Sequence, residues 1–176
     1  DTPSTSFEVV QVDLVGPYPI TERGFRYAVT YQCTLTKYVD AVPIVDKSAK
    51  SVARAIVEKI FCKYGLSKIV SDRGTEFVNE TWREVCQLLR IEHKTSTAHH
   101  HQSLGSVERS HRVWNEFLRA NGSDKDSEWD RLLPFFCFAF NSTPTSGSGY
   151  TPYERVFGKL PNFPNVVATG HNFRVD

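Results

Sequence analysis

Apolar and β-branched residues in the first quarter of the chain occur in three short runs that polar residues separate. Runs of this length, rich in Val, Tyr and Phe and bounded by Gly, Pro or Asp, are typical of β-strands. The three predicted strands cover residues 7–16, 25–34 and 37–45. Because the connections between them are short, the pattern predicts a β-meander.

The middle of the chain alternates between helical and strand patterns. From Ser48, a candidate N-cap, apolar residues recur at helical spacing up to Gly65, which predicts a helix with one buried face. A strand over 66–72, a helix over 76–90 and a strand over 91–97 follow. The residues of the second helix expected to face the core are Val78, Trp82, Val85, Cys86 and Leu89.

The last third of the chain is helical and then rich in Gly, Ser and Pro. We expect a helix over 106–120, a turn over 121–126 and a helix over 127–140 that Pro134 interrupts. One short helical segment is predicted within the tail, over 151–158.

These elements predict an α/β fold, with a five-stranded mixed sheet flanked by helices on both faces. A chain of 176 residues is long enough to form one domain with its own core. We therefore expect a single domain over 1–176, with a folded core at about 7–160 and an extension over 161–176.

Composition narrows the function classes only slightly. The formal net charge of +1, from 21 basic and 20 acidic residues, excludes a histone-like polycation but leaves room for a local basic face. No apolar run is long enough to span a bilayer, and the N-terminus lacks the order of a secretory signal, so we expect an intracellular protein without a membrane segment. The four cysteines are far apart in sequence, which indicates buried free thiols.

Three carboxylates from three elements are the candidate chemistry. Asp13 lies inside an apolar strand, where an unpaired buried carboxylate would be costly, so a functional role is favoured. Asp72 ends a strand beside a glycine, as a turn residue also would. Glu108 falls in the first turn of the helix predicted over 106–120, where an acid is favourable in any protein. The set of three is therefore more informative than each member.

The sequence around these acids resembles the catalytic core of retroviral and LTR-retrotransposon integrases, closest to gypsy-like (Metaviridae) elements. The matching phrases are VDLVGP, SDRGTEF and HHHQSLGSVER, with 35 residues between Asp72 and Glu108, and GYTPYERVFGKLP near the C-terminus. The resemblance implies a ribonuclease-H-like fold and a DDE-type polynucleotidyl transferase. That enzyme would carry out 3′-end processing and strand transfer, which insert retroelement DNA into host DNA.

The same resemblance implies a metal site. Asp13, Asp72 and Glu108 would hold two Mg²⁺ (or Mn²⁺) ions, with Asp13 bridging both. Hard carboxylate oxygens suit these ions, and two ions are a common solution for phosphoryl transfer.

DNA contacts are expected on the helix that carries Glu108. His111, Arg112 and Asn115 follow Glu108 by three, four and seven residues, so helical periodicity places them on one face. The family's matching positions contact the DNA end. For Arg112 the alternative is a solvated helix face with an ion pair to Glu108.

The loop before this helix supplies two further candidates, His99 and Gln102. Gly105 is expected to allow a sharp entry into the helix. His101 occupies the position of the family's proline.

The resemblance implies partners as well: retroelement DNA ends, target DNA, a homo-oligomer through the helices over 48–64 and 127–140, and optionally a host chromatin-tethering protein. It also implies a nuclear location. The family's N-terminal zinc domain and C-terminal barrel do not fit this chain. Two alternatives stay open: a domesticated core that binds DNA or protein without catalysis, and a ribonuclease-H-like nuclease.

Overall fold

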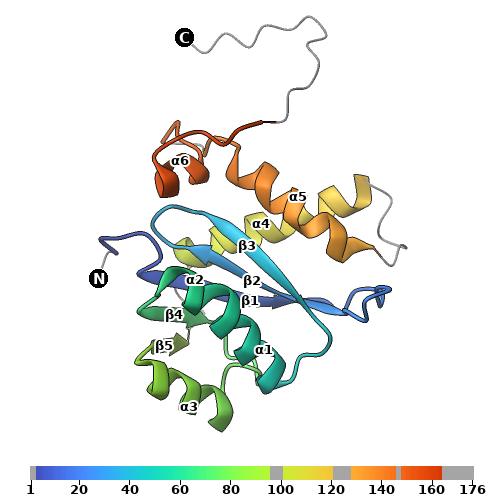
Figure 1. Cartoon of the computed structure of the whole chain (residues 1–176), viewed down its shortest axis with the longest axis vertical. Coiled ribbons are helices and arrows are strands. Elements are labelled where there is room, and N and C mark those ends of the chain that lie inside the picture. The colour runs from blue at the N-terminus through green and yellow to red at the C-terminus, as the bar shows by residue number, and fades with distance from the viewer. Residues whose placement is uncertain (1–2, 96–100, 121–127, 146–147, 164–176) are drawn as a thin grey trace, which may run out of the picture.

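The fold is built on a five-stranded mixed sheet. The computed structural model describes residues 3–95, 101–120, 128–145 and 148–163, with the backbone alone for 101–109 and 120. The strands are β1 (Val9–Val15), β2 (Tyr27–Cys33), β3 (Val39–Ile44), β4 (Lys68–Ser71) and β5 (Glu92–Thr95), arranged in the order β3-β2-β1-β4-β5 (Figure 1). β1, β2 and β3 are antiparallel neighbours, as the meander requires, whereas β4 and β5 extend the sheet in parallel with β1. The predicted α/β fold class is confirmed.

Helices cover both faces of this sheet. They are α1 (Ala49–Ile56), a π-helical turn η1 (Val57–Phe61), α2 (Cys62–Tyr64), α3 (Glu80–Leu89), α4 (His101–Ala120), α5 (Trp129–Asn141) and α6 (Pro152–Phe157). The first three form one helical segment, which begins after Ser48 and ends at Gly65 as predicted. Figure 1 shows α1 to α3 on one side of the sheet and α4 and α5 on the other. Within the described residues, no helix is both long and apolar enough to cross a lipid bilayer.

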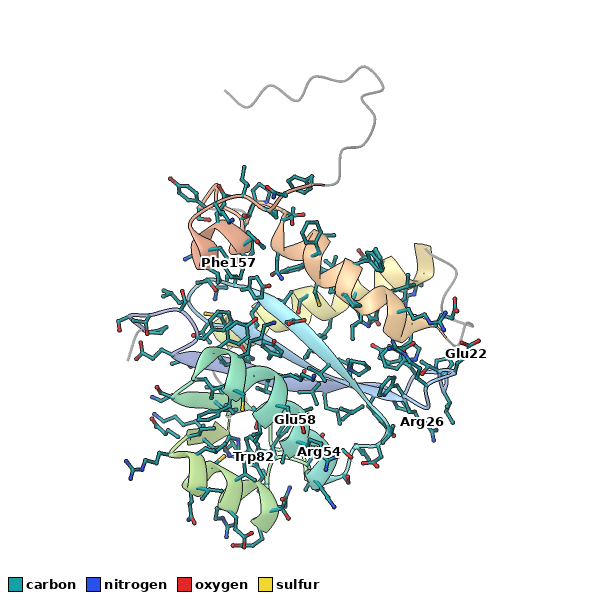
Figure 2. All side chains as sticks on the ribbon, in the orientation of Figure 1. Glu22, Arg26, Arg54, Glu58, Trp82 and Phe157 are labelled. Carbon is teal, nitrogen blue, oxygen red and sulfur yellow. The ribbon has the colours of Figure 1, made fainter. Side chains whose placement is uncertain are left out.

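Strand alternation divides the interior into two cores. On β1, Val10 and Val12 are buried on the face toward α1 and α3, and Asp13 falls on the opposite face. Trp82 of α3 belongs to the first core and lies between α3 and α1 (Figure 2). The second core packs α4 and α5 on the other face, through Trp114, Leu118, Trp129, Leu133 and Phe136.

The segment after β1 holds these two helices in place. The indole Nε1 of Trp114 donates to the Tyr18 hydroxyl at 3.0 Å, and that of Trp129 donates to the main-chain oxygen of Pro19 at 2.8 Å. Buried Asp130, in the first turn of α5, pairs with Arg23 at 2.5 Å. α4 therefore has a fixed position relative to β1.

Three predictions about the helices were wrong. α4 begins at His101, five residues before the predicted start, so Gly105 lies inside the helix and not at its entry. α3 begins later than predicted because Asn79 caps it, accepting the Trp82 N–H at 2.9 Å. Val78 consequently precedes the helix and is 54% exposed, outside the core.

The third wrong prediction is the break at Pro134, because α5 continues through this residue. A proline removes one intrahelical hydrogen bond. Here its ring is on the exposed side, while Leu133, Phe136 and Cys137 beside it are buried against the sheet. Packing on both sides of the proline therefore preserves the helix.

The prediction of buried free cysteines is confirmed in part. All four cysteines are free, but Cys62 is exposed, whereas Cys33, Cys86 and Cys137 are buried. Of the predicted extension over 161–176, the structure describes only residues 161–163, and the ring of Phe163 packs edge-on against Phe138 of α5.

The core assignment makes a prediction about stability. Ile69 on β4 is fully buried in the first core, whereas Leu88 on α3 is 82% exposed. Ile69→Ala should lower the free energy of unfolding by about 2–5 kcal/mol through lost burial and a cavity. Leu88→Ala should change it by less than about 0.5 kcal/mol. Urea denaturation measures both, and equal losses would contradict the assigned core.

Candidate active site

Asp13 is presented by the central strand of the sheet, on the face that α4 covers. Its side chain is 35% exposed, so it is neither fully buried nor free in solvent. Carboxylate Oδ1 accepts the Leu14 N–H at 2.8 Å. One oxygen of the carboxylate is thus oriented by the backbone of its own strand.

The parallel pairing of β1 with β4 brings the end of β4 next to the strand that carries Asp13. The last parallel pair is Gln11 with Val70; Asp13 lies two residues further along β1, and Asp72 directly follows Ser71, the last residue of β4. Neighbouring strands are about 4.8 Å apart. The two acids therefore lie at the same end of adjacent parallel strands, the place where open α/β sheets commonly bind ligands.

The turn after β4 fixes the orientation of Asp72. Its exposed carboxylate accepts the Gly74 N–H through Oδ1 at 2.9 Å. A Cβ added to Gly74 would lie 3.0 Å from this oxygen and 2.7 Å from Oε1 of Glu76, so a larger residue would displace these carboxylates from their present positions. Asp72 acts as a turn residue with Oδ1, a role that is compatible with metal binding through Oδ2.

The helix that carries Glu108 passes next to Asp13. The backbone of residue 108 is part of α4, and its side chain lies outside what the structure describes. One turn later, His111 packs against the sheet: its Nδ1 is 3.6 Å from Asp13 Oδ2, and its Nε2 is 2.9 Å from Thr30 Oγ1. This contact brings α4 to the carboxylate.

The residues expected to bind DNA do not share one environment. Arg112 and Asn115 are exposed on the outer face of α4, whereas His111 is directed toward the sheet and has an 18% exposed side chain. Gln102 belongs to the first turn of α4 and not to a loop, with a side chain that is not described. His99 lies outside the described residues.

Sequence reasoning missed two hydroxyl–imidazole pairs behind the acids. Thr30 Oγ1 contacts His111 Nε2 and, at 3.3 Å, the main-chain oxygen of Asp13. Ser71 Oγ donates to the main-chain oxygen of Asp72 at 2.9 Å and contacts Nε2 of His93 on β5, also at 2.9 Å. The position of Ser71 next to Asp72 was a visible signal. Thr30 meets Asp13 only through the register of β1 and β2, which the sequence does not reveal.

Burial lowers the pKa of His93, the imidazole that contacts Ser71, because the charged ring would lose its hydration. The neutral ring is therefore favoured. A neutral imidazole can both accept and donate a hydrogen bond, as its contact with a hydroxyl requires.

The described acids fit a divalent ion in part. Carboxylate oxygens are the ligands that Mg²⁺ and Mn²⁺ prefer, and both Asp13 and Asp72 are accessible. Among the side chains that the structure describes, no group of three Asp, Glu, His or Cys residues is placed to hold a metal. The side chain of Glu108 is not among them, so this finding covers only two of the three expected ligands, Asp13 and Asp72.

Comparisons with known proteins agree with this geometry. Residues 3–101 match the family described as Integrase core domain. The chain is 48% identical over 165 residues, 93% of its length, to the Retrovirus-related Pol polyprotein from transposon 412 of Drosophila melanogaster. It is 32% identical over 159 residues, 90% of its length, to Gypsy retrotransposon integrase-like protein 1 of Bos taurus. It spans only 13% and 32% of these two relatives.

A solved structure shares the fold. The crystal structure of the catalytic core domain of BIV integrase in crystal form I superimposes with a TM-score of 0.70 at 25% identity, covering 86% of this chain and 95% of that chain. The five-stranded sheet and its helices are thus the ribonuclease-H-like fold of integrase catalytic cores. With the family match and the retrotransposon relatives, these findings show that the chain belongs to the integrase core domain family of retroviral and retrotransposon Pol proteins.

Proposed function

We propose that this core is catalytic, a DDE-type polynucleotidyl transferase that processes the 3′ ends of retroelement DNA and joins them to host DNA. One observation carries the proposal: Asp13 on β1 and Asp72, directly after β4, lie towards the same end of two adjacent parallel strands, and His111 of α4 contacts Asp13. An acid one helical turn before His111 is then in place to be the third member.

Glu108 has that position. It precedes His111 by three residues, about 4.5 Å along the axis of α4 at the usual rise per residue. It precedes exposed Arg112 by four, so position 108 falls between the sheet-facing and the solvent-facing sides of the helix. We assign Glu108 to the boundary between the protein interior and bound DNA.

The three acids, Asp13, Asp72 and Glu108, would together hold two Mg²⁺ or Mn²⁺ ions, since carboxylate oxygens are the ligands that these ions prefer. The chemistry that such ions supply is stabilisation of charge on the attacking and leaving oxygens of a phosphodiester, together with activation of water. Divalent ions also offset the repulsion that three carboxylates would impose on an anionic substrate.

The chain's own residues orient the reacting groups. Leu14 and Gly74 each fix one carboxylate oxygen through a backbone N–H, of Asp13 and Asp72 respectively. Arg112 projects from the same stretch of α4 into solvent, where a guanidinium can bind a DNA phosphate through two hydrogen bonds. Because the nucleophile is water or a DNA 3′-hydroxyl, no covalent protein intermediate is needed.

Oligomerisation and cellular location extend the proposal. Retroelement DNA ends and target DNA must be held together, which favours a homo-oligomer formed through the 49–64 helical segment and α5. Phe135 and Phe138 of α5 are 68% and 40% exposed, and they supply an apolar surface for such contacts. Action on chromosomal DNA implies the nucleus, with a chromatin-tethering partner as an option.

Catalysis is tested with a branched DNA that mimics an integration intermediate, in Mg²⁺ and separately in Mn²⁺. The chain should resolve this substrate, and Asp72→Asn or Glu108→Gln should reduce the rate by at least about 100-fold, because each removes one ligand charge. Glu116→Gln, which changes an exposed acid two turns further along α4, should retain activity.

Equal rates for the chain and the two triad variants would contradict the proposal. An inactive chain that binds DNA equally well with and without metal would indicate a non-catalytic module instead.

Arg112 makes a separate prediction about DNA affinity. Arg112→Ala should weaken binding of duplex DNA and reduce the slope of log affinity against log salt by about 1, because one phosphate contact is lost. Arg83→Ala is the control, since Arg83 is exposed on α3 across the sheet from α4 and pairs with Glu80. Fluorescence anisotropy over a salt series measures both slopes, and identical slopes would exclude a phosphate contact by Arg112.

A further inference from the structure

Both ring nitrogens of His111 are directed at groups inside the protein. Nδ1 is 3.6 Å from Oδ2 of Asp13, and Nε2 is 2.9 Å from Oγ1 of Thr30. Thr30 is also the residue that faces Asp13 across the β1–β2 pair, and its hydroxyl is 3.3 Å from the main-chain oxygen of Asp13. His111 is therefore linked to Asp13 directly through the carboxylate and indirectly through the neighbouring strand.

A hydrogen on Nδ1 makes the contact with Asp13 favourable, because a lone pair directed at a carboxylate would be repulsive. The contact between Nε2 and the Thr30 hydroxyl can have either direction, depending on the tautomer of the ring. In its contact at 3.3 Å the same hydroxyl donates to the main-chain oxygen of Asp13.

We propose that His111 is a positioning residue for Asp13, which sets the direction of the Asp13 carboxylate and holds α4 at the active site. The proposal rests on the proposed function, because it concerns how the metal-binding acids are arranged. Oδ1 of Asp13 accepts the Leu14 N–H, and Nδ1 of His111 lies 3.6 Å from Oδ2, within electrostatic range, so the two groups face different oxygens of the carboxylate. Groups that orient a metal ligand in this way usually contribute 10–100-fold to metal affinity.

The position of His111 on α4 suits this role. The neighbouring turn is anchored by Trp114, whose side chain is 2% exposed and whose Nε1 donates to Tyr18. His111 is three residues from Trp114 and three from Glu108, so it lies between the anchored part of the helix and the third acid. A shift of α4 at His111 would move the backbone of residue 108 relative to Asp13.

The chain contains its own control for this inference. His93 makes the same kind of contact with a hydroxyl, Ser71 Oγ at 2.9 Å, and that hydroxyl likewise donates to the main-chain oxygen of an acid, Asp72. The described contacts of His93 do not include the Asp72 carboxylate, which instead accepts the Gly74 N–H. Replacing His93 removes a comparable hydrogen bond without removing a contact to a carboxylate.

The test is an Mn²⁺ titration of the intact chain, followed by electron paramagnetic resonance, with thermal unfolding measured on each variant. His111→Leu and His111→Gln should weaken Mn²⁺ binding by at least about 10-fold, because neither leaves a donor at the Nδ1 position. His111→Asn should bind Mn²⁺ within about 3-fold of the unmodified chain, because its amide nitrogen can take the place of Nδ1. His93→Leu should bind Mn²⁺ normally.

Thr30→Val is a second route to the same answer if His111→Leu does not fold. It removes the hydroxyl at nearly constant volume and should weaken Mn²⁺ binding in the same direction, by less than His111→Leu. The same variants are compared in turnover of the branched DNA, where His111→Asn should again be closer to the unmodified chain than His111→Leu.

Two results would overturn the positioning role. The first is that His111→Leu binds Mn²⁺ as tightly as the unmodified chain. The second is that His111→Asn loses as much Mn²⁺ affinity as His111→Leu, because equal losses would indicate that His111 contributes only packing. Failure of the unmodified chain to bind Mn²⁺ would instead overturn the proposed function. The two failures are thereby distinguished.

Discussion

The parallel pairing of β1 with β4 is the constraint on which the rest of the site depends. It places Asp13 and Asp72 at the same end of adjacent strands, although 58 residues separate them in the chain. No local preference could bring two like charges together, because their repulsion opposes it. The pairing is stabilised elsewhere, by the buried side chains of Val10, Val12 and Ile69 beneath it. Burial in the first core thus holds the acids in an arrangement that they would not adopt alone.

The second core holds α4 in place, as the first core holds the paired strands β1 and β4. This helix approaches the sheet on the face where Asp13 emerges, and it is fixed by Trp114 and by its packing against α5. Asp130 and Arg23 attach α5 in turn to the turn between β1 and β2. The backbone position of Glu108, the proposed third acid, therefore depends on contacts made by residues outside the proposed triad. The family match and the shared fold of a solved integrase core are consistent with a scaffold that positions a small set of acidic residues.

Much of the fold could be predicted from the sequence, because the signals were local. Strand alternation and Gly-Pro boundaries defined β1 to β3, and Ser48 and Gly65 defined the first helical segment. The errors arose where a tertiary or capping interaction prevailed over the local pattern. Asn79 shortened α3, buried neighbours carried α5 through Pro134, and α4 extended past Gly105. For the proposed site, the sequence offered the three acids as candidates through their phrases, but Thr30 and His93 became visible only through strand register and burial. The sequence did not indicate that His111 is directed toward the sheet. Helical periodicity shows which residues lie near one another on a helix, but it does not show which of them contact the sheet.

The central claim is that Asp13, Asp72 and Glu108 converge on one metal site. The most direct measurement is a crystal structure of the chain soaked in Mn²⁺, with anomalous diffraction recorded at the manganese edge. We expect anomalous peaks among the three carboxylates, about 3.5–4 Å apart if both ions bind, with Asp13 contacting each. Manganese bound elsewhere, or Glu108 directed away from Asp13 while Asp13 and Asp72 hold an ion without it, would contradict the claim.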